Sequence, residues 1–555
     1  MHLKEYKKNK ALKMLGLLRY EGRSETERLT FVVDEDKIKL TKLLEYNIWY
    51  RGDEEELLNF YTKQNLIDYN FEPIYQRGKK DYFWAQSTTE NNIKRTHSGQ
   101  AKNIVDTLVS VVGEPISIKI EGEATDDILQ QIIEENDFMS LFKEEQLPLT
   151  LVEGWGAYKI NWDSDFSDTP LILYYKADAV DFFYKSGRLI GIMYKDYFKD
   201  EQGKKYLITE TRYLGKDKDT GRRSLFVEKE LFEMPGGEEY ILPREFEDFP
   251  QFKHIQPRVE VEGYGKLLGE PCILYRGDKN EMYGKSIFTG KISMLDDLDQ
   301  AWSQLANTTR KSTPIEYIDV NFLQRDRKTG MPIAPKSYDR KYTMYVGAPI
   351  AESGTRNEPV QVTQPDLRLQ EFLSETKELL MNIVSGLMSP ATMGIDIAKK
   401  DNADAQREKE KVTIFTRKGI VTKQIRIIKN LLEQCLDAYE LMHSGVIKNT
   451  EPYDITVKFS EFADDSYDSK LAVLGSAFAN KIISPEMLIS KLYSSDELSE
   501  EDKQREIDYI KENSKEPFQD GFNPDGDDSQ AVPGGNPFGD EIDEDEDSEN
   551  LQNSL

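Results

Sequence analysis

Three long helical stripes limit the fold of this chain more than any other feature. Between residues 285 and 312, apolar side chains recur at three- and four-residue steps, which predicts one face of a helix about 40 Å long. A second stripe follows Pro365, with Asp366 as a candidate N-cap. The third covers about 405–443 and would be about 58 Å long. A single helix pair buries only one stripe on each member, so helices of this length favour a lateral partner, which a ring of subunits would supply.

Two irregular segments separate the stripes. Residues 313–365 are short, Pro-punctuated and strand-like, and they would lie at the far end of an antiparallel pair formed by the first two helices. In residues 388–404, Pro390 and Gly394 are expected to break the helix, and Asp401 or Asn402 to restart it. This interruption is either a loop that projects from the helices or an ordinary connector.

The chain before the first stripe mixes helices with strands. We expect an amphipathic helix within residues 39–61, with Leu40, Leu43, Leu44 and Ile48 on one side, in a peripheral N-terminal part. A helix carrying Ile104, Val105, Leu108 and Val112, a strand over 116–120 and a helix over about 125–147 follow. The alternating runs of 150–280 predict an antiparallel β module.

After the third stripe, PYDITVKF predicts a strand, and helices are expected within 467–515. Residues 516–555 carry many acidic residues and no basic one, with Pro and Gly spread through them. Such a segment buries too little apolar surface to offset its ordering entropy, so we expect disorder.

The net charge limits the possible binding partners, and the cysteines indicate the redox compartment. The formal net charge of −28 should repel nucleic acid and anionic membranes, so any DNA contact must be local. Cys272 and Cys435 form no CxxC unit, which suits a reducing compartment. The sequence contains no run of about 18 apolar residues, so we expect no membrane-spanning helix, and the N-terminus has no obvious secretion signal.

Motifs for catalysis are weak. Gly284, Lys285 and Ser286 resemble the end of a phosphate-binding loop, but Lys279 stands where that motif needs glycine. The four histidines form no HExxH pattern, and no GxSxG elbow is present. Asp296, Asp297 and Asp299 could hold Mg²⁺ for phosphodiester cleavage or could form a solvated acidic face. No cofactor is implied.

Several segments, taken in order, resemble the portal proteins of tailed bacteriophages. They are AKNIVDTLVSVVGEPISI, GWGAYKINWD, YGKSIFTGKISMLDDLDQAWSQ and SGLMSPATMG with the long helix after it. The resemblance runs from about Asn91 to Tyr493. It implies an α+β subunit with a wing, a two-helix stem, a small α/β clip, a tunnel loop with a long wing helix, and a helical crown.

The resemblance also implies a division of the chain. The segments would be 1–284 wing (with 1–90 peripheral), 285–312 first stem helix, 313–365 clip, 366–387 second stem helix, 388–404 tunnel loop, 405–465 long helix and return to the wing, and 466–515 crown, followed by the acidic tail.

The family forms dodecameric rings at one capsid vertex, through which double-stranded DNA is packaged and later ejected. The implied partners are other copies of the chain, the DNA, the terminase, head-tail adaptors, and the major capsid and scaffold proteins. The implied location is the virion, and the host cytoplasm during assembly, with no membrane and no catalysis by the ring itself.

Charge should be arranged so that DNA passes without being held, because each lysine or arginine that neutralises a phosphate adds affinity. Asp296, Asp297 and Asp299 are candidates for an acidic channel wall, and Lys399 and Lys400 for transient contacts from the loop at Pro390 and Gly394. The basic residues of the clip would line the DNA exit, meet an acidic partner or simply belong to an exposed hairpin; they are Arg325, Arg327, Lys328, Arg340 and Lys341.

Two alternatives to a portal remain. One is a metal-dependent enzyme acting on DNA through the aspartate cluster. The other is a non-viral scaffold protein built on helical rods.

Overall fold

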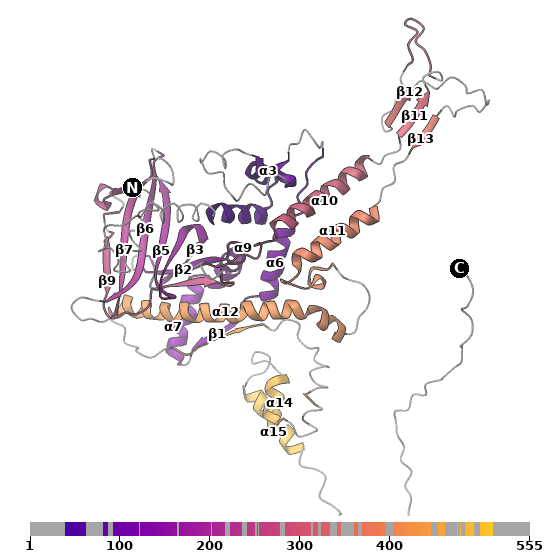
Figure 1. Ribbon diagram of the computed structural model, residues 1–555. Helices are drawn as coiled ribbons and strands as arrows, with labels where there is room; N and C mark the ends of the chain where they lie inside the picture. The colour runs from indigo at the N-terminus through magenta and orange to yellow at the C-terminus, as the bar shows by residue number, and fades with distance from the viewer. Residues whose placement is uncertain are drawn as a thin grey trace, which may run out of the picture. The chain divides into compact units, whose positions relative to one another are not determined.

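A computed structural model gives the fold of the chain, which divides into two compact units, residues 1–462 and 463–555 (Figure 1). The residues that it describes are 39–62, 82–86, 93–120, 122–163, 166–200, 203–216, 223–235, 241–249, 252–253, 255–277, 283–311, 315–319, 323–333, 341–345, 360–363, 369–395, 403–445, 453–460, 474–475, 478, 483–492 and 500–513. The expected acidic tail, 516–555, lies outside them.

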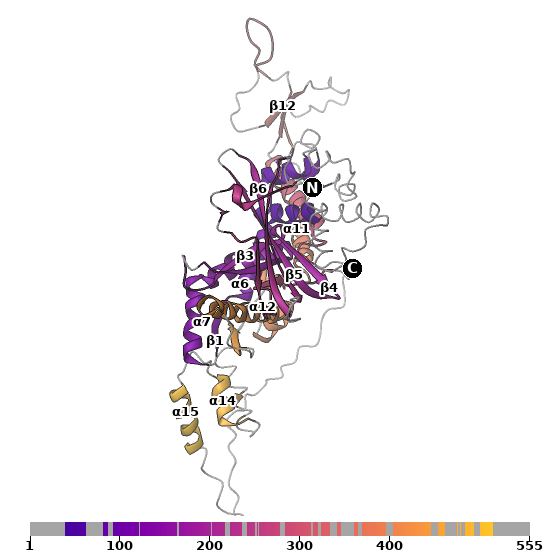
Figure 2. The ribbon, with the colours of Figure 1, turned by 90° about the vertical axis from the view of Figure 1, so that its left-hand side faces the viewer.

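Strands and helices are both abundant, and the sheets are mainly antiparallel, so the fold class is α+β as the sequence predicted. A six-stranded sheet has the order β4-β5-β6-β7-β8, and β9 pairs with β7. Figure 2 shows its strands β4, β5 and β6. Its strands are β4 (Val180–Lys185), β5 (Arg188–Lys199), β6 (Lys205–Lys216), β7 (Arg223–Glu233), β8 (Leu242–Arg244) and β9 (Arg258–Val261). Ser186 and Gly187, both with positive φ, form the tight turn between β4 and β5.

A second sheet has the order β10-β2-β3 and is antiparallel throughout. Its strands are β2 (Trp155–Asn161), β3 (Leu171–Lys176) and β10 (Gly269–Ile273). A buried ionic cluster joins it to β6: Arg212 donates to the carbonyl oxygens of Ile160 and Leu268 and is paired with Glu210. The antiparallel β module expected over 150–280 is confirmed.

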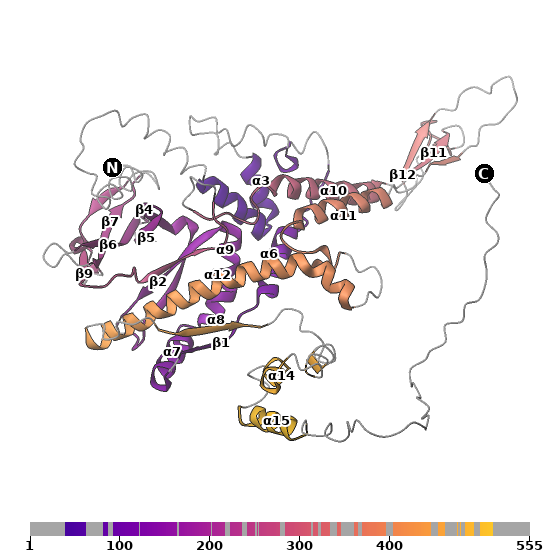
Figure 3. The ribbon, with the colours of Figure 1, turned by 60° about the horizontal axis from the view of Figure 1, so that its bottom comes forward.

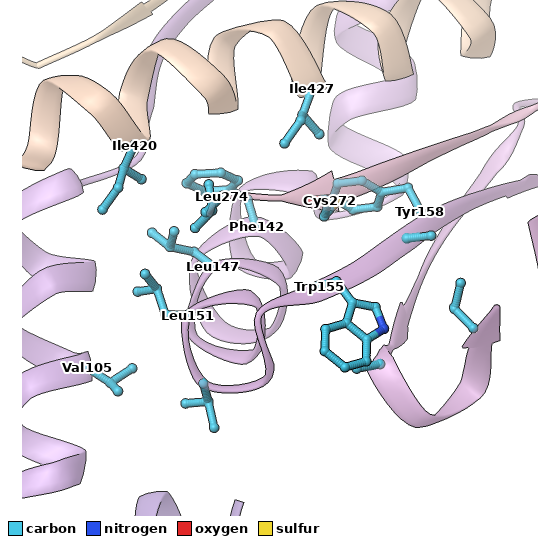
Figure 4. Close-up of a cluster of buried hydrophobic side chains, with 14 of the residues drawn as sticks. Val105, Phe142, Leu147, Leu151, Trp155, Tyr158, Cys272, Leu274, Ile420 and Ile427 are labelled. Carbon is cyan, nitrogen blue, oxygen red and sulfur yellow. The ribbon is translucent and has the colours of Figure 1, made fainter. Parts of the chain in front are cut away.

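Helices pack on this second sheet and bury the main core. They are α9 (Leu147–Glu153) and the long helix α12 (Ala403–Ser444); two further helices, α6 (Gln100–Val112) and α7 (Glu123–Glu135), pack in turn on α12. Figure 4 shows side chains from these elements meeting, with Val105 of α6, Leu151 of α9, Tyr158 of β2 and Ile427 of α12 among them. The predictions of a buried face on α6 and of a third long helix near 405–443 are confirmed.

Polar contacts fix α12 along the sheet (Figure 3). Asn430 and Gln434 donate to the carboxylate of Glu270 on β10, at 2.9 and 3.4 Å. Burial is the main cause that raises the pKa of Glu270 to about 7. Farther along the helix, Asp437 accepts from Lys266 at 2.8 Å. These contacts set the register of a helix whose apolar stripe alone would allow sliding.

The helix expected over 125–147 is interrupted, which corrects the sequence prediction. After α7, Asn136 donates to the carbonyl oxygens of Ile132 and Pro170, and Asp137 takes a left-handed conformation. The chain then resumes as a short helix α8 (Phe138–Ser140), a π-helical stretch (Leu141–Gln146) and α9. The side chain of Asn136 joins this break to the start of strand β3, because it donates to Pro170 and accepts from the Ile172 N–H at 2.7 Å.

The described residues of the N-terminal part, 39–62 and 82–86, contribute to the main core and are not peripheral, contrary to the sequence prediction. A helix at 39–51, α3 (Glu54–Thr62) and the short 3-10 helix η2 (Phe83–Ala85) bury Trp49, Leu57 and Trp84 in the main core. The predicted stripe is split, because Leu43 and Ile48 are buried whereas Leu40 and Leu44 are exposed.

The remaining elements lie toward the end of the chain. The two predicted strands are both present, and β1 (Pro115–Ile120) pairs antiparallel with β14 (Ile455–Phe459). In the second unit, α14 (Pro485–Leu492) packs against α15 (Glu500–Asn513), with an ion pair between Glu486 and Lys511 at 2.5 Å. Among the described residues, no helix has the length and apolar character that crossing a membrane requires.

Candidate functional site: the helix pair, its inserted sheet and the turn before the long helix

Two long helices pack side by side and form the centre of the candidate site (Figure 1). They are α10 (Ile292–Lys311) and α11 (Leu369–Val384). At the start of α10, Lys291 donates from Nζ to the carbonyl oxygens of Ile383 and Ser385, at 2.6 and 3.0 Å. A cation at the C-terminal end of α11 meets carbonyl groups that the helix leaves unpaired. The contact makes the pair antiparallel, as the sequence predicted.

Only the first half of the apolar stripe predicted along α10 is buried in the core. Phe288, Ile292, Leu295 and Leu298 are buried, but Trp302 is 41% exposed. Along α11, Ile383 and Val384 are buried, whereas Leu369 and Leu373 are exposed. Each helix therefore has a buried half next to the core and a second half with apolar side chains in solvent.

Asp296 and Asp299 face the protein interior, so the prediction of a channel-facing acidic wall is wrong for both. Asp296 accepts from the backbone N–H groups of Phe83 and Trp84, at 2.7 and 3.2 Å. Asp299 accepts from the Trp84 indole at 3.0 Å, and also from His97 Nδ1 at 2.7 Å and the Ser98 N–H at 2.8 Å. Only Asp297 of the three is exposed.

The hydrogen bonds of Asp296 and Asp299 give this buried pair a structural role, because they attach α10 to neighbouring segments. Burial is the main cause that raises the pKa of Asp296 to about 7, with the nearby charges of Asp299 and Asp297 adding to it and the two N–H donors opposing it. All four carboxylate oxygens already accept protein hydrogen bonds, which leaves them poorly suited to hold Mg²⁺. Among the residues that the structure describes, no group of three or more candidate ligands is placed to hold a metal ion.

The residues that contact this aspartate pair and α10 were not predicted from the sequence. Trp84, His97 and Ser303 meet around α10, and Ser303 accepts from the N–H of Thr96 at 3.0 Å. The rings of Trp49 and Trp84 also lie against His97. The available signal was a short aromatic run, Tyr82–Trp84, and a histidine in a polar segment, which does not by itself identify a partner.

The turn after α11 contains the predicted helix break, but the break begins earlier than Pro390. α11 ends at Val384 and Gly386 has a φ of 77°; a 3-10 helix η8 (Pro390–Met393) then ends at Gly394, whose φ is 71°. Positive φ favours glycine at both positions. Pro390 begins η8 and Gly394 ends it, so both lie within the interruption, but neither ends α11, and Gly386 was overlooked.

The first part of the predicted tunnel loop is held against α12. Met388 and Ser389 are buried, and Ser389 N–H donates to Thr413 Oγ1 at 2.8 Å. The prediction of a projecting loop is therefore wrong for residues 388–395. Lys399 and Lys400 lie outside the described residues.

The predicted clip contains a small mixed sheet. β11 (Ile315–Asp319) pairs in parallel with β12 (Lys341–Tyr345) and antiparallel with β13 (Val360–Thr363). Residues 323–333 form an exposed turn that carries Arg325, Arg327 and Lys328. Arg340 lies outside the described residues, and of Lys341 only the backbone position at the start of β12 is described.

Gly284, Lys285 and Ser286 have a packing role rather than that of a phosphate loop. The backbone of Gly284 lies against Gly154, and Lys285 N–H donates to the carbonyl of Tyr275 at 2.8 Å. Ser286 Oγ accepts from Phe288 N–H at 3.0 Å, which starts the turn that leads into α10.

Comparisons with known proteins leave the family open. A scan of family models finds no match for this chain, and a search of curated proteins finds none. One solved structure to which the chain is similar is described as "Neck of native GTA particle computed with C12 symmetry", at 13% identity and a TM-score of 0.37. The match covers 71% of this chain and 90% of that chain. A likeness at this level establishes neither the fold nor the function of this chain.

Proposed function

We propose that this chain is the subunit of a tailed-phage portal, a homo-oligomeric ring at one capsid vertex. Double-stranded DNA would pass through its channel during packaging and ejection. The terminase and later the head-tail adaptors would dock on the sheet β11–β13, and capsid and scaffold proteins would surround the ring. The ring would gate the DNA without catalysis, and the energy would come from a separate motor.

The exposed apolar side chains of the helix pair carry this proposal. Trp302 on α10 and Leu369 and Leu373 on α11 are large and solvent-exposed in the single chain. Exposed apolar side chains that gather along neighbouring helices mark a surface that a partner covers. Copies of the same pair, placed side by side around an axis, would cover these side chains and close on themselves.

The charge of the chain fits a channel that does not hold its DNA. A net charge of −28 opposes tight binding to phosphates, and Asp297 is the exposed acidic residue at the base of α10. We propose that Lys399 and Lys400, in the segment after Pro390 and Gly394, supply weak transient contacts to the DNA. Unchanged packaging and DNA retention in the Lys399→Ala/Lys400→Ala variant would contradict that role.

A polar substitution on the helix pair tests the proposal. Leu373→Asp should abolish ring assembly, because it places a charge where a neighbouring copy would cover the leucine. Leu242→Asp on β8 is the matched control, since Leu242 is 42% exposed and Leu373 is 43% exposed. Light scattering on the full-length chains should give monomers for the first and wild-type rings for the second. Equal assembly of both variants would contradict the proposed surface.

A further inference from the structure

The turn at 323–333 is a well-ordered hairpin. Ile333 N–H donates to the carbonyl of Gln324 at 2.7 Å, and Asp326 N–H donates to that of Met331 at 2.9 Å. The Asp326 carboxylate accepts from Lys328 N–H and Thr329 Oγ1, at 3.1 and 2.9 Å. These hydrogen bonds, the first of them from the backbone, lower the pKa of Asp326. The hairpin therefore presents its side chains from a fixed backbone.

Its outward surface combines positive charge with apolar area. Arg325, Arg327 and Lys328 are exposed and form no ion pair with any residue that the structure describes. Beside them, Met331 is 70% exposed and Ile333 is 50% exposed. Phosphates of DNA would be recognised by the cations alone, whereas a protein surface with carboxylates and aliphatic groups would use both kinds of side chain.

A surface of complementary chemistry lies on α11. One face of this helix forms a shallow groove lined by Glu371, Ser374, Glu375, Glu378, Leu379 and Asn382. The groove extends over about 16 Å of the helix axis, and Leu379 adds apolar area beside its carboxylates. The exposed Leu369 and Leu373 lie on the opposite face of the helix and take no part in it. Glu375 and Glu378 form no ion pair with any described residue.

We propose that the hairpin at 323–333 of one copy docks in the α11 groove of the adjacent copy. In the single chain both surfaces remain exposed, so the hairpin does not occupy the groove of its own chain. Every copy carries one hairpin and one groove, which gives a head-to-tail contact that a ring can repeat until it closes. The inference rests on the proposed ring and adds to it a charged contact that sets the register between neighbours.

Cross-linking between differently marked copies tests the contact. Full-length chains with Lys328→Cys and with Glu375→Cys are co-expressed and treated with a short bismaleimide; Cys272 and Cys435 are buried and should not react. We expect a covalent dimer of the two variants. The pair Lys185→Cys and Glu375→Cys is the control, because Lys185 is an exposed lysine in another hairpin, and it should give no dimer.

A charge exchange supplies the second measurement. Arg327→Glu/Lys328→Glu should raise the protein concentration needed for half-assembly by roughly ten-fold at low salt. Adding Glu375→Lys/Glu378→Lys should restore it. Lys185→Glu/Arg188→Glu changes the net charge equally and should leave assembly unchanged.

The outcomes separate this contact from the ring itself. Rings that form normally in the Arg327→Glu/Lys328→Glu variant, with no mixed cross-link, would overturn the docking and leave the portal proposal standing. A cross-link confined to one chain in the double-cysteine variant, or a defect in DNA packaging alone, would also overturn it. Wild-type protein that forms no ring would refute the portal proposal instead.

Discussion

The indole of Trp84 donates a hydrogen bond to Asp299 across 3.0 Å, and both side chains are buried. The contact joins η2 in the N-terminal part to the middle of α10. His97 and Ser98 bind the same carboxylate, so residues 82–86 and 93–99 are both fixed to the base of the helix pair. Asp299 therefore links α10 to the core through hydrogen bonds, in addition to the apolar packing of the helix.

Asp299→Ala should therefore lower the free energy of unfolding by about 3 kcal/mol, because it leaves three buried donors without an acceptor. Urea unfolding of the full-length chain measures the loss. Asp297→Ala is the control, since this exposed neighbour should change stability by less than about 0.5 kcal/mol. Similar losses in both variants would show that the buried hydrogen bonds are not what holds the helix.

Asp296 should make stability depend on pH in a particular direction. Its pKa in the folded chain is about 7, against an ordinary 3.8, chiefly because of burial. The folded state therefore binds this proton more tightly, and the stabilisation is present below about pH 4 and is lost as pH rises toward 7. The slope reaches at most about 1.4 kcal/mol per pH unit.

The difference in unfolding free energy between wild type and Asp296→Asn isolates this effect, because the other carboxylates titrate in both proteins. Wild type should lose stability relative to the variant between pH 4 and pH 7. A difference that stays constant over that range would rule out a titrating Asp296.

Glu210 on β6 should behave in the opposite way. Burial alone would raise its pKa, but Arg212 at 2.7 Å and Lys159 at 3.0 Å outweigh it and hold the pKa well below the usual range. Its stabilising effect is present above the ordinary glutamate pKa and is lost as pH falls. Glu210→Gln should cost about 3–5 kcal/mol at pH 7, because buried cations lose their counter-charge.

Thermal or urea unfolding measures this cost, with the exposed Glu260→Gln as the control. A Glu210→Gln variant as stable as the control would mean that water reaches the cluster and screens it.

Gly284 should tolerate no side chain. A Cβ there would overlap the carbonyl oxygen of Gly154. Gly284→Ala should thus destabilise the chain by more than about 2 kcal/mol, because backbone must move. Gly290 has open space and a φ of 78°, so Gly290→Ala should cost only about 1 kcal/mol of left-handed strain. Circular dichroism melts of the two variants give the comparison, and equal melting temperatures would refute the close backbone contact.

Local periodicity predicted the elements whose packing is also local. The strands over 150–280 and the helix α12 were readable from their repeats, although β2 is buried at almost every position and Val412 and Phe415 of α12 are exposed. Partners far apart in sequence were not readable. Asp296 and Asp299 resembled a solvated acidic face because their donors, Phe83 and Trp84, lie in a segment with no helical or strand repeat.

The sequence also did not show where along α10 the apolar stripe changes from buried to exposed. Leu295 and Trp302 share the predicted face of α10, yet the first is buried and the second is exposed, because the core ends partway along the helix. Similarly, Asn136 breaks a helix through hydrogen bonds to Pro170 and Ile172, which only the tertiary fold brings near.

Imaging of the purified full-length chain tests the ring most directly. Negative-stain electron microscopy should show closed rings with an axial opening wide enough for a DNA duplex, and with α10 and α11 at the contacts between neighbouring copies. Isolated monomers or dimers at concentrations where portals assemble, with no axial opening in any particle, would contradict the account.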